Sequence, residues 1–199
     1  MFFLLLILVS IYACGNEKSD TSLKELYFDI DESLLSAPII DDTLGIEFRV
    51  PKYVHDLDPD IRKQLAANLG SQELPGLGII IEPRQIFMDS TQKFILMINR
   101  IASVQDTMHS DAIESAYKNY LSKQLGDKIV RKGSFSKQGI PVTQFVIQDG
   151  TSTIMKIFFS NDHRSLVQFD YLILADYDQR IKAIEASIGS INQLKQGGN

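Results

Sequence analysis

Residues 152–191 read STIMKIFFSNDHRSLVQFDYLILADYDQRIKAIEASIGSI, and this stretch decides the fold. It begins with two runs rich in β-branched and aromatic residues, 152–160 and 165–174, joined by a polar turn. In the second run apolar side chains alternate with Gln168 and Asp170, which predicts a strand with one buried face and one wet face. An amphipathic helix follows, and its apolar side chains recur at helical spacing: Tyr177, Ile181, Ile184, Ile188 and Ile191.

Two further strand patterns precede this stretch, at residues 128–136 and 141–148, and short polar turns separate all four runs. Together they predict a four-strand antiparallel meander. Asp176 and Gln179 have the spacing of a capping box at the start of the closing helix, which should cover the sheet.

The upstream half of the chain alternates between strand and helix patterns. The predicted elements are a half-buried strand at 46–50, a helix opened by Asp58-Pro59 and ended by Gly70, short strands at 79–81 and 85–88 separated by Pro83, a central strand at 94–102, and a helix from about Ser110 to Leu125. We expect one domain at residues 44–195, preceded by a tether and loosely docked arm at 14–43 and followed by a frayed tail at 196–199.

The first residues of the chain are apolar without a break through residue 9, and Ser10 is followed by Ile11-Tyr12-Ala13-Cys14. The run is shorter than the roughly 20 residues that cross a bilayer, but it fits the apolar region of a signal peptide. Residues 11–14 resemble the lipobox of bacterial lipoproteins, in which the cysteine is acylated and becomes the mature N-terminus. This resemblance implies a lipoprotein signal peptide at residues 1–13 and a palmitate-type lipid anchor on Cys14.

Two points about the leader bear on location. The alternative for Cys14, an unmodified cysteine at the end of a buried helix, is disfavoured because the segment is apolar on every side. A lipidated Cys14 implies the bacterial cell envelope, and Gly15 in place of Asp after the cysteine favours the outer membrane over the inner membrane.

The formal net charge is −5, and every charged residue follows Cys14. An acidic domain has no general attraction to nucleic acid or to anionic lipid. We therefore expect no nucleic-acid partner, and we expect the lipid anchor rather than the protein surface to hold the chain at a membrane.

The order of predicted elements from residue 44 to about residue 193 is an α+β arrangement. It resembles the PsbP-like fold, an α/β/α sandwich whose antiparallel sheet is covered by helices, and three phrases carry the resemblance: Ile46 to Pro51, Lys132 to Phe135 with Gly139 to Val142, and Tyr171 to Ser190. The resemblance implies a non-enzymatic domain that docks onto partners or assists assembly. No residue matches that family's metal or photosystem role, so no cofactor is expected. A helix-grip domain around an apolar cavity is the alternative layout.

Motifs with catalytic or metal-binding spacing are weak. Asp56, Asp58 and Asp60 have the alternation of a calcium loop, but the Gly and Glu that such a loop needs do not follow, and helix capping explains them better. The histidines lie far apart in the sequence and are expected in exposed turns: His55, His109 and His163. The sequence contains no G-x-S-x-G elbow and no phosphate-binding glycine loop.

Aromatic side chains are the remaining candidates for a ligand or partner surface: Tyr117, Tyr120, Phe158, Phe159, Tyr171 and Tyr177. The tyrosines are spaced to line a cavity, although core packing fits the same spacing. Phe158 and Phe159 place one ring on each face of a strand, and a ring on an uncovered face would mark a docking patch.

These observations predict a membrane-anchored envelope lipoprotein with a non-catalytic domain that binds a protein or assists assembly. The alternative is a binder of a small apolar or lipid-like ligand between the sheet and the closing helix. A third possibility, an enzyme, would require a cleft with converging carboxylates or histidines.

Overall fold

The structure is a computed structural model that describes residues 23–57, 60–61, 72–161, 165–174 and 177–194. Its centre is an eight-stranded antiparallel sheet with the order β3-β5-β6-β10-β9-β8-β7, and β4 pairs with β5 off this path. The strands are β3 (Val54–Asp56), β4 (Gln72–Leu74), β5 (Ile79–Asp89), β6 (Phe94–Ser103), β7 (Ile129–Lys137), β8 (Ile140–Asp149), β9 (Ser152–Ser160) and β10 (Ser165–Ile173).

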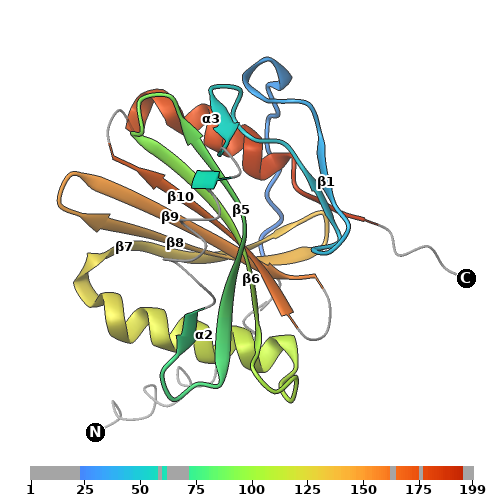
Figure 1. Cartoon of the computed structure of the whole chain (residues 1–199), viewed down its shortest axis with the longest axis vertical. Helices are drawn as coiled ribbons and strands as arrows, with labels where there is room; N and C mark the ends of the chain where they lie inside the picture. The colour runs from blue at the N-terminus through green and yellow to red at the C-terminus, as the bar shows by residue number, and fades with distance from the viewer. Residues whose placement is uncertain (1–22, 58–59, 62–71, 162–164, 175–176, 195–199) are drawn as a thin grey trace, which may run out of the picture.

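A second, three-stranded sheet and the helices cover the central sheet. The small sheet has the order β1-β2-β11, formed by β1 (Ile39–Asp41), β2 (Ile46–Phe48) and β11 (Asn192–Gln193). The helices are α2 (Ser110–Leu125) and α3 (Tyr177–Gly189), with 3-10 turns at η1 (Glu32–Leu34) and η2 (Gly126–Lys128). Figure 1 shows α3 above and α2 below the fanned strands. The predicted α+β class with a sheet covered by helices is confirmed.

The predicted meander is confirmed as β7 to β10, each strand pairing antiparallel with the next. The predicted wet face is wrong, because Gln168 and Asp170 are only 1% and 3% exposed. The apolar alternation in β10 does mark a buried face, but α2 packs against the opposite face and removes it from water as well. Both faces of the central strands are therefore buried.

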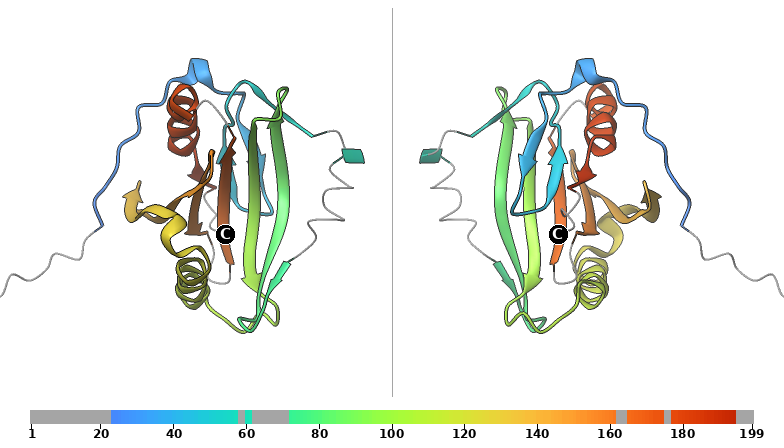
Figure 2. Two further views of the ribbon diagram at one scale, coloured as in Figure 1. Left: turned by 90° about the vertical axis from the view of Figure 1, so that its left-hand side faces the viewer. Right: turned by 90° about the vertical axis from the view of Figure 1, so that its right-hand side faces the viewer.

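Two separate cores result from this layering. On one face of the sheet, side chains such as Phe169 pack with Phe48 of β2 and Ile184 of α3. On the other face, Phe158 packs against Tyr117 of α2. Figure 2 shows the sheet edge-on, with the two helices at opposite ends of it. Burial of apolar surface on both faces, at about 25 cal/mol per Å², is the main force that holds the layers together.

Residues 79–89 form one continuous strand, β5, rather than the two short strands predicted on either side of Pro83. The register of the β5–β6 pairing shifts between Pro83 and Gln85, so that Arg84 is the extra residue of a bulge. Proline has no N–H to give to the ladder, and a bulge lets the strand continue past it. The central strand predicted at 94–102 is confirmed as β6, which lies between β5 and β10.

The second predicted helix is confirmed as α2, and Gly126 ends it with a φ of 49°. The helix predicted from Asp58-Pro59 to Gly70 lies mostly outside the described residues. Asp176 of the predicted capping box also lies outside them, while α3 itself follows the predicted stripe, with Ile184 and Ile188 buried against the sheet. None of the described helices is long and apolar enough to span a bilayer.

The segment from Leu23 to Asp42 contacts the domain at several points. The backbone N–H of Leu26 donates to the carbonyl of Ser136 (2.8 Å), and the N–H of Ser136 donates to the carbonyl of Lys24 (2.9 Å). Farther along, Phe28 packs on Phe135 with ring centroids 5.9 Å apart. These contacts place the start of the segment along β7, the last strand of the central sheet.

Candidate functional site

The six aromatic candidates do not gather into one site. Tyr117 and Phe158 belong to the core under α2, and Tyr120 is partly buried at its margin. Phe159 and Tyr171 belong to the core under α3, where Tyr177 is partly buried. The sheet separates the two groups, so these side chains cannot line a common cavity.

The predicted docking patch at the Phe158-Phe159 pair is wrong. The two rings lie on opposite faces of β9 as the sequence indicates, but both are buried, because α2 covers one face and α3 with the small sheet covers the other. Phe158 contacts Tyr117 edge-on at 5.3 Å between ring centroids, and Phe159 stacks on Phe169 at 6.5 Å. Their role in this structure is core packing.

The buried tyrosines have local partners. Tyr171 lies 3.2 Å from the Ser187 hydroxyl, which in turn donates to the carbonyl of Arg49 at 2.8 Å. This chain of contacts ties β10 to α3 and to the end of the β2 segment. Burial raises the pKa of Tyr117 to about 12, and it raises the pKa of Tyr171 in spite of the hydrogen bond with Ser187. Both phenols are therefore neutral and structural near neutral pH.

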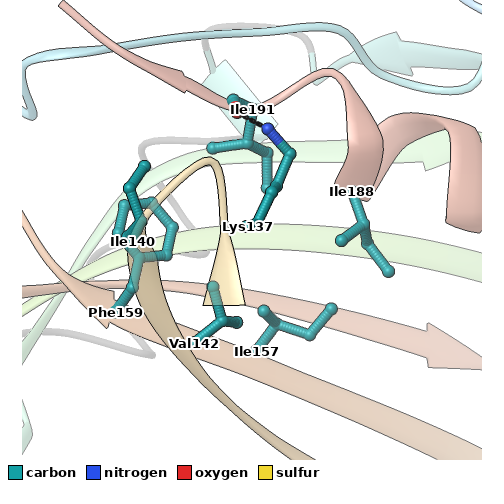
Figure 3. A pocket seen from close by; sticks show the side chains of 7 residues that line it. All are labelled: Lys137, Ile140, Val142, Ile157, Phe159, Ile188 and Ile191. Carbon is teal, nitrogen blue, oxygen red and sulfur yellow. Dashed lines mark hydrogen bonds between the residues drawn. The ribbon is translucent and has the colours of Figure 1, made fainter. Parts of the chain in front are cut away.

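A small hollow lies between the meander and the end of α3, as Figure 3 shows. Its wall is apolar apart from one lysine: Lys137, Ile140, Val142, Ile157, Phe159, Ile188 and Ile191. The Lys137 ammonium donates to the carbonyl of Ile191, and burial lowers the pKa of Lys137. The empty volume of about 260 Å³, which includes space open to solvent, is below the 300–1,000 Å³ of most sites for drug-sized molecules.

A buried polar cluster crosses the central strands next to α2, and the sequence patterns gave no sign of it. The Lys156 ammonium lies 2.8 Å from the Asp170 carboxylate, and the same carboxylate oxygen accepts from the side-chain amides of Gln168 (2.7 Å) and Asn99 (3.3 Å). Burial lowers the pKa of Lys156, but the charge and hydrogen bond of Asp170 together with Tyr117 outweigh burial and raise the pKa overall. Lys156 is therefore charged, and the pair is an ion pair inside the sheet.

A second buried ion pair ties α3 to the β5–β6 hairpin. Arg180 lies 2.8 Å from Asp89, and the guanidinium also stacks over the rings of Tyr53 and Phe94. Asp89 begins the polar run Asp89-Ser90-Thr91-Gln92, a composition typical of a turn, but no sequence pattern links that turn to the closing helix. Arg180 and Asp89 lie 91 positions apart in the sequence, whereas Lys156 and Asp170 lie 14 positions apart on neighbouring strands.

Metal-binding and titratable candidates remain scattered. Within the described ranges no group of three or more His, Cys, Asp or Glu side chains is placed to hold a metal ion. His55 lies exposed on β3 and His109 precedes α2, while Asp58, His163 and Cys14 lie outside the described residues. The prediction of a lipid anchor on Cys14 is therefore untested by the geometry.

Of the comparisons with known proteins, the one with solved structures gives a match. No protein-family model matches the chain, and no curated protein matches its sequence. Among solved structures the chain is similar to the solution structure of cyanobacterial PsbP (CyanoP) from Synechocystis sp. PCC 6803, with 14% identity and a TM-score of 0.48. The match covers 80% of this chain and 92% of the cyanobacterial one. A likeness of this degree says nothing about activity or partners.

Proposed function

We propose that this chain is a lipid-anchored protein of the bacterial cell envelope whose domain binds another protein or assists assembly, without catalysing a reaction. The observation that carries the proposal is the apolar leader ending in Ile11-Tyr12-Ala13-Cys14. A cysteine that carries more than one fatty chain holds a protein firmly at a bilayer, since each buried methylene contributes about 0.8 kcal/mol.

The packing of the domain supports a role at the surface rather than in the interior. Both faces of the central strands are covered, and the largest aromatic side chains fill the two cores. The two buried ion pairs, Lys156–Asp170 and Arg180–Asp89, connect structural elements instead of lining a cleft. A partner would therefore contact exposed strands, loops or helix faces.

The first experiment tests the anchor. Cys14→Ser should move the protein from the detergent phase to the aqueous phase in a phase-partition assay and abolish labelling by radioactive palmitate. Ser22→Ala, a change in the same region that keeps the thiol, should leave both properties as in the unmodified chain. Palmitate labelling of the Cys14→Ser variant would show that the assigned attachment is wrong.

The second experiment tests the partner. Chemical crosslinking of intact cells, followed by purification of the acylated chain, should return the same envelope protein in repeated preparations. The Cys14→Ser chain should lose that crosslink, because the anchor brings the two proteins together. If crosslinked membranes return nothing above an untagged control, the proposal of a protein partner fails.

A second candidate function is binding of a small apolar or lipid-like molecule. The apolar wall of the hollow at the end of α3 favours it, and the small volume of the hollow would hold only part of such a molecule. Ile140→Trp would fill this hollow from its half-buried rim, and Ile39→Trp adds the same bulk at a half-buried position on β1. Native mass spectrometry of the chain purified from cells should show a bound lipid that Ile140→Trp loses and Ile39→Trp keeps. A chain that carries no bound molecule in either case would remove this candidate.

A further inference from the structure

Although the chain is acidic as a whole, its basic residues concentrate at one end of the sheet. Residues 115–148, from the middle of α2 to near the end of β8, contain six Lys or Arg and one carboxylate, Asp127. The negative net charge of the rest of the chain is therefore larger in magnitude than the net charge of the whole chain. Net charge alone hides this separation, and a local field depends on the separation rather than on the sum.

Four exposed basic side chains of this region surround the outer edge of β7 and are called the basic edge: Lys123, Lys128, Arg131 and Lys132. Of these four side chains, only Lys128 has a carboxylate of the described residues at ion-pair distance, Asp149 at 3.0 Å. Lys132 lies over the ring of Phe145, 5.1 Å from the ring centroid. Three of the four charges thus have no carboxylate partner within the described part of the chain.

The path of the chain places the basic edge close to the anchor. Residues 24–26 run alongside β7, where Glu25 forms a parallel bridge with Ser136. Lys24 follows Cys14 by ten positions, and a chain of that length spans at most about 35 Å. Figure 1 shows the start of β7, which follows α2 and carries Arg131 and Lys132, on the left of the view and β1 on the right. The tether is therefore long enough for the basic edge to reach a bilayer that holds Cys14.

We propose that the basic edge contacts anionic phospholipid headgroups of the membrane that holds the anchor, so that β7 and the end of α2 face the bilayer. This inference rests on the acylation of Cys14 proposed above. Attraction to an anionic surface acts within about 8 Å in physiological salt, a distance that the short tether allows. Each basic residue near the surface favours this orientation about five-fold.

The test measures which side of the acylated chain lies close to lipid. Val130 on β7 and Ile40 on β1 are 62% and 60% exposed, so each accepts a single cysteine without loss of core packing. Because Cys14 is the only natural cysteine and is acylated in this scheme, the new thiol alone reacts with a fluorophore. Quenching by a spin label on the lipid headgroup is then compared between vesicles of phosphatidylcholine and vesicles with an equal part of phosphatidylglycerol.

We expect the label at position 130 to be quenched more strongly than the label at position 40, only on vesicles with phosphatidylglycerol, and we expect molar salt to remove the difference. Arg131→Glu with Lys132→Glu should reduce the membrane-facing orientation by about 25-fold or more, from about five-fold for each residue. Lys52→Glu with Lys182→Glu makes the same change in net charge at exposed positions outside the basic edge and should keep the difference.

The outcomes separate the two proposals. A chain that does not float with the vesicles at all contradicts the anchor. A chain that floats but shows equal quenching at both positions on anionic vesicles overturns the basic-edge inference and leaves the anchor standing. In native membranes, a photo-crosslinker at position 130 should react with lipid; a protein adduct at that position would instead assign the basic edge to a protein partner and overturn the inference.

Discussion

The Asp89–Arg180 pair should contribute strongly to stability, and Asp89→Asn tests this. One carboxylate oxygen of Asp89 accepts from the backbone N–H groups of Lys93 (2.8 Å) and Phe94 (3.1 Å). The other accepts from Arg180 (2.8 Å) and from the Thr91 hydroxyl (2.7 Å). A single side chain thus fixes the β5–β6 turn and holds α3 against it.

The magnitude follows from what asparagine keeps and loses. The amide oxygen of the variant still serves the two backbone N–H groups, but an uncharged NH₂ group then faces Arg180. The side chains of Arg180 and Asp89 are only 14% and 6% exposed, so the guanidinium loses its anion where water screens little. A charge-assisted hydrogen bond contributes about 1.5–3 kcal/mol, and removing one member of a buried pair costs about 3–5 kcal/mol. We expect a loss of about 3 kcal/mol.

The loss should depend on pH in a defined direction. Burial raises the pKa of Asp89, but hydrogen bonds from Thr91, the Phe94 and Lys93 N–H groups and Arg180 together hold it below 3.8. Because the folded pKa is lower than the unfolded one, the charged carboxylate stabilises the fold fully above about pH 5, and this contribution disappears as the pH falls through the folded pKa. The difference between the two proteins should therefore shrink in acid.

Urea denaturation at a series of pH values measures both effects, with Asp127→Asn, an exposed carboxylate, as the matched control. The control should change the free energy of unfolding by less than about 0.5 kcal/mol. If Asp89→Asn behaves like the control at pH 7, or if its deficit is the same at pH 3 as at pH 7, the assigned role of the pair is wrong.

The remaining predictions concern the buried cluster and the arm. Asp170→Asn should cost about 3–5 kcal/mol in denaturant unfolding, because the buried Lys156 charge loses its partner. Asp170→Leu combined with Lys156→Met should recover only part of that loss, because the amides of Gln168 and Asn99 still lose their acceptor; a double variant no more stable than Asp170→Asn would contradict this account. Gly189→Ala should loosen the arm, since the added Cβ would lie 2.6 Å from the Cβ of Phe28; faster cleavage of residues 23–30 in limited proteolysis would show it. Gly133→Ala, which meets nothing within 4 Å, should leave the cleavage rate unchanged.

Periodicity predicted the meander and α2 because both are local. The two-residue alternation in β10 and the apolar stripe of α2, with Gly126 at its end, depend only on neighbouring residues. The same alternation misled about Gln168 and Asp170. A polar residue in a strand indicates a solvent-exposed face only if no other layer covers that face. The docking of α2 on this face depends on residues far away in the sequence, so the local alternation cannot predict it.

The candidate site was less predictable than the fold. From the sequence alone, each aromatic residue could belong either to the core or to an exposed surface. Only the positions of both helices show that Phe158 and Phe159 are core side chains. Arg180, the partner of Asp89, lies 91 positions away in the sequence. Asp170, the partner of Lys156, lies on the neighbouring strand, and the turn between β9 and β10 sets that pairing. Similarly, Arg84 becomes a bulge only because Pro83 must be accommodated against β6.

The small sheet has a consequence for the timing of folding. β2 lies between β1 and β11, and the N–H of Leu194 donates to the carbonyl of Gly45 at 2.9 Å, so the ends of the domain close on each other. Contacts across such long separations form late, because the loop entropy must be overcome first. On the ribosome, β2 cannot acquire its second neighbour until residues 192–194 have left the exit tunnel. A chain destined for export would therefore keep its small sheet incomplete until residues 192–194 emerge, and an incompletely folded chain is what a secretion channel for unfolded polypeptides requires.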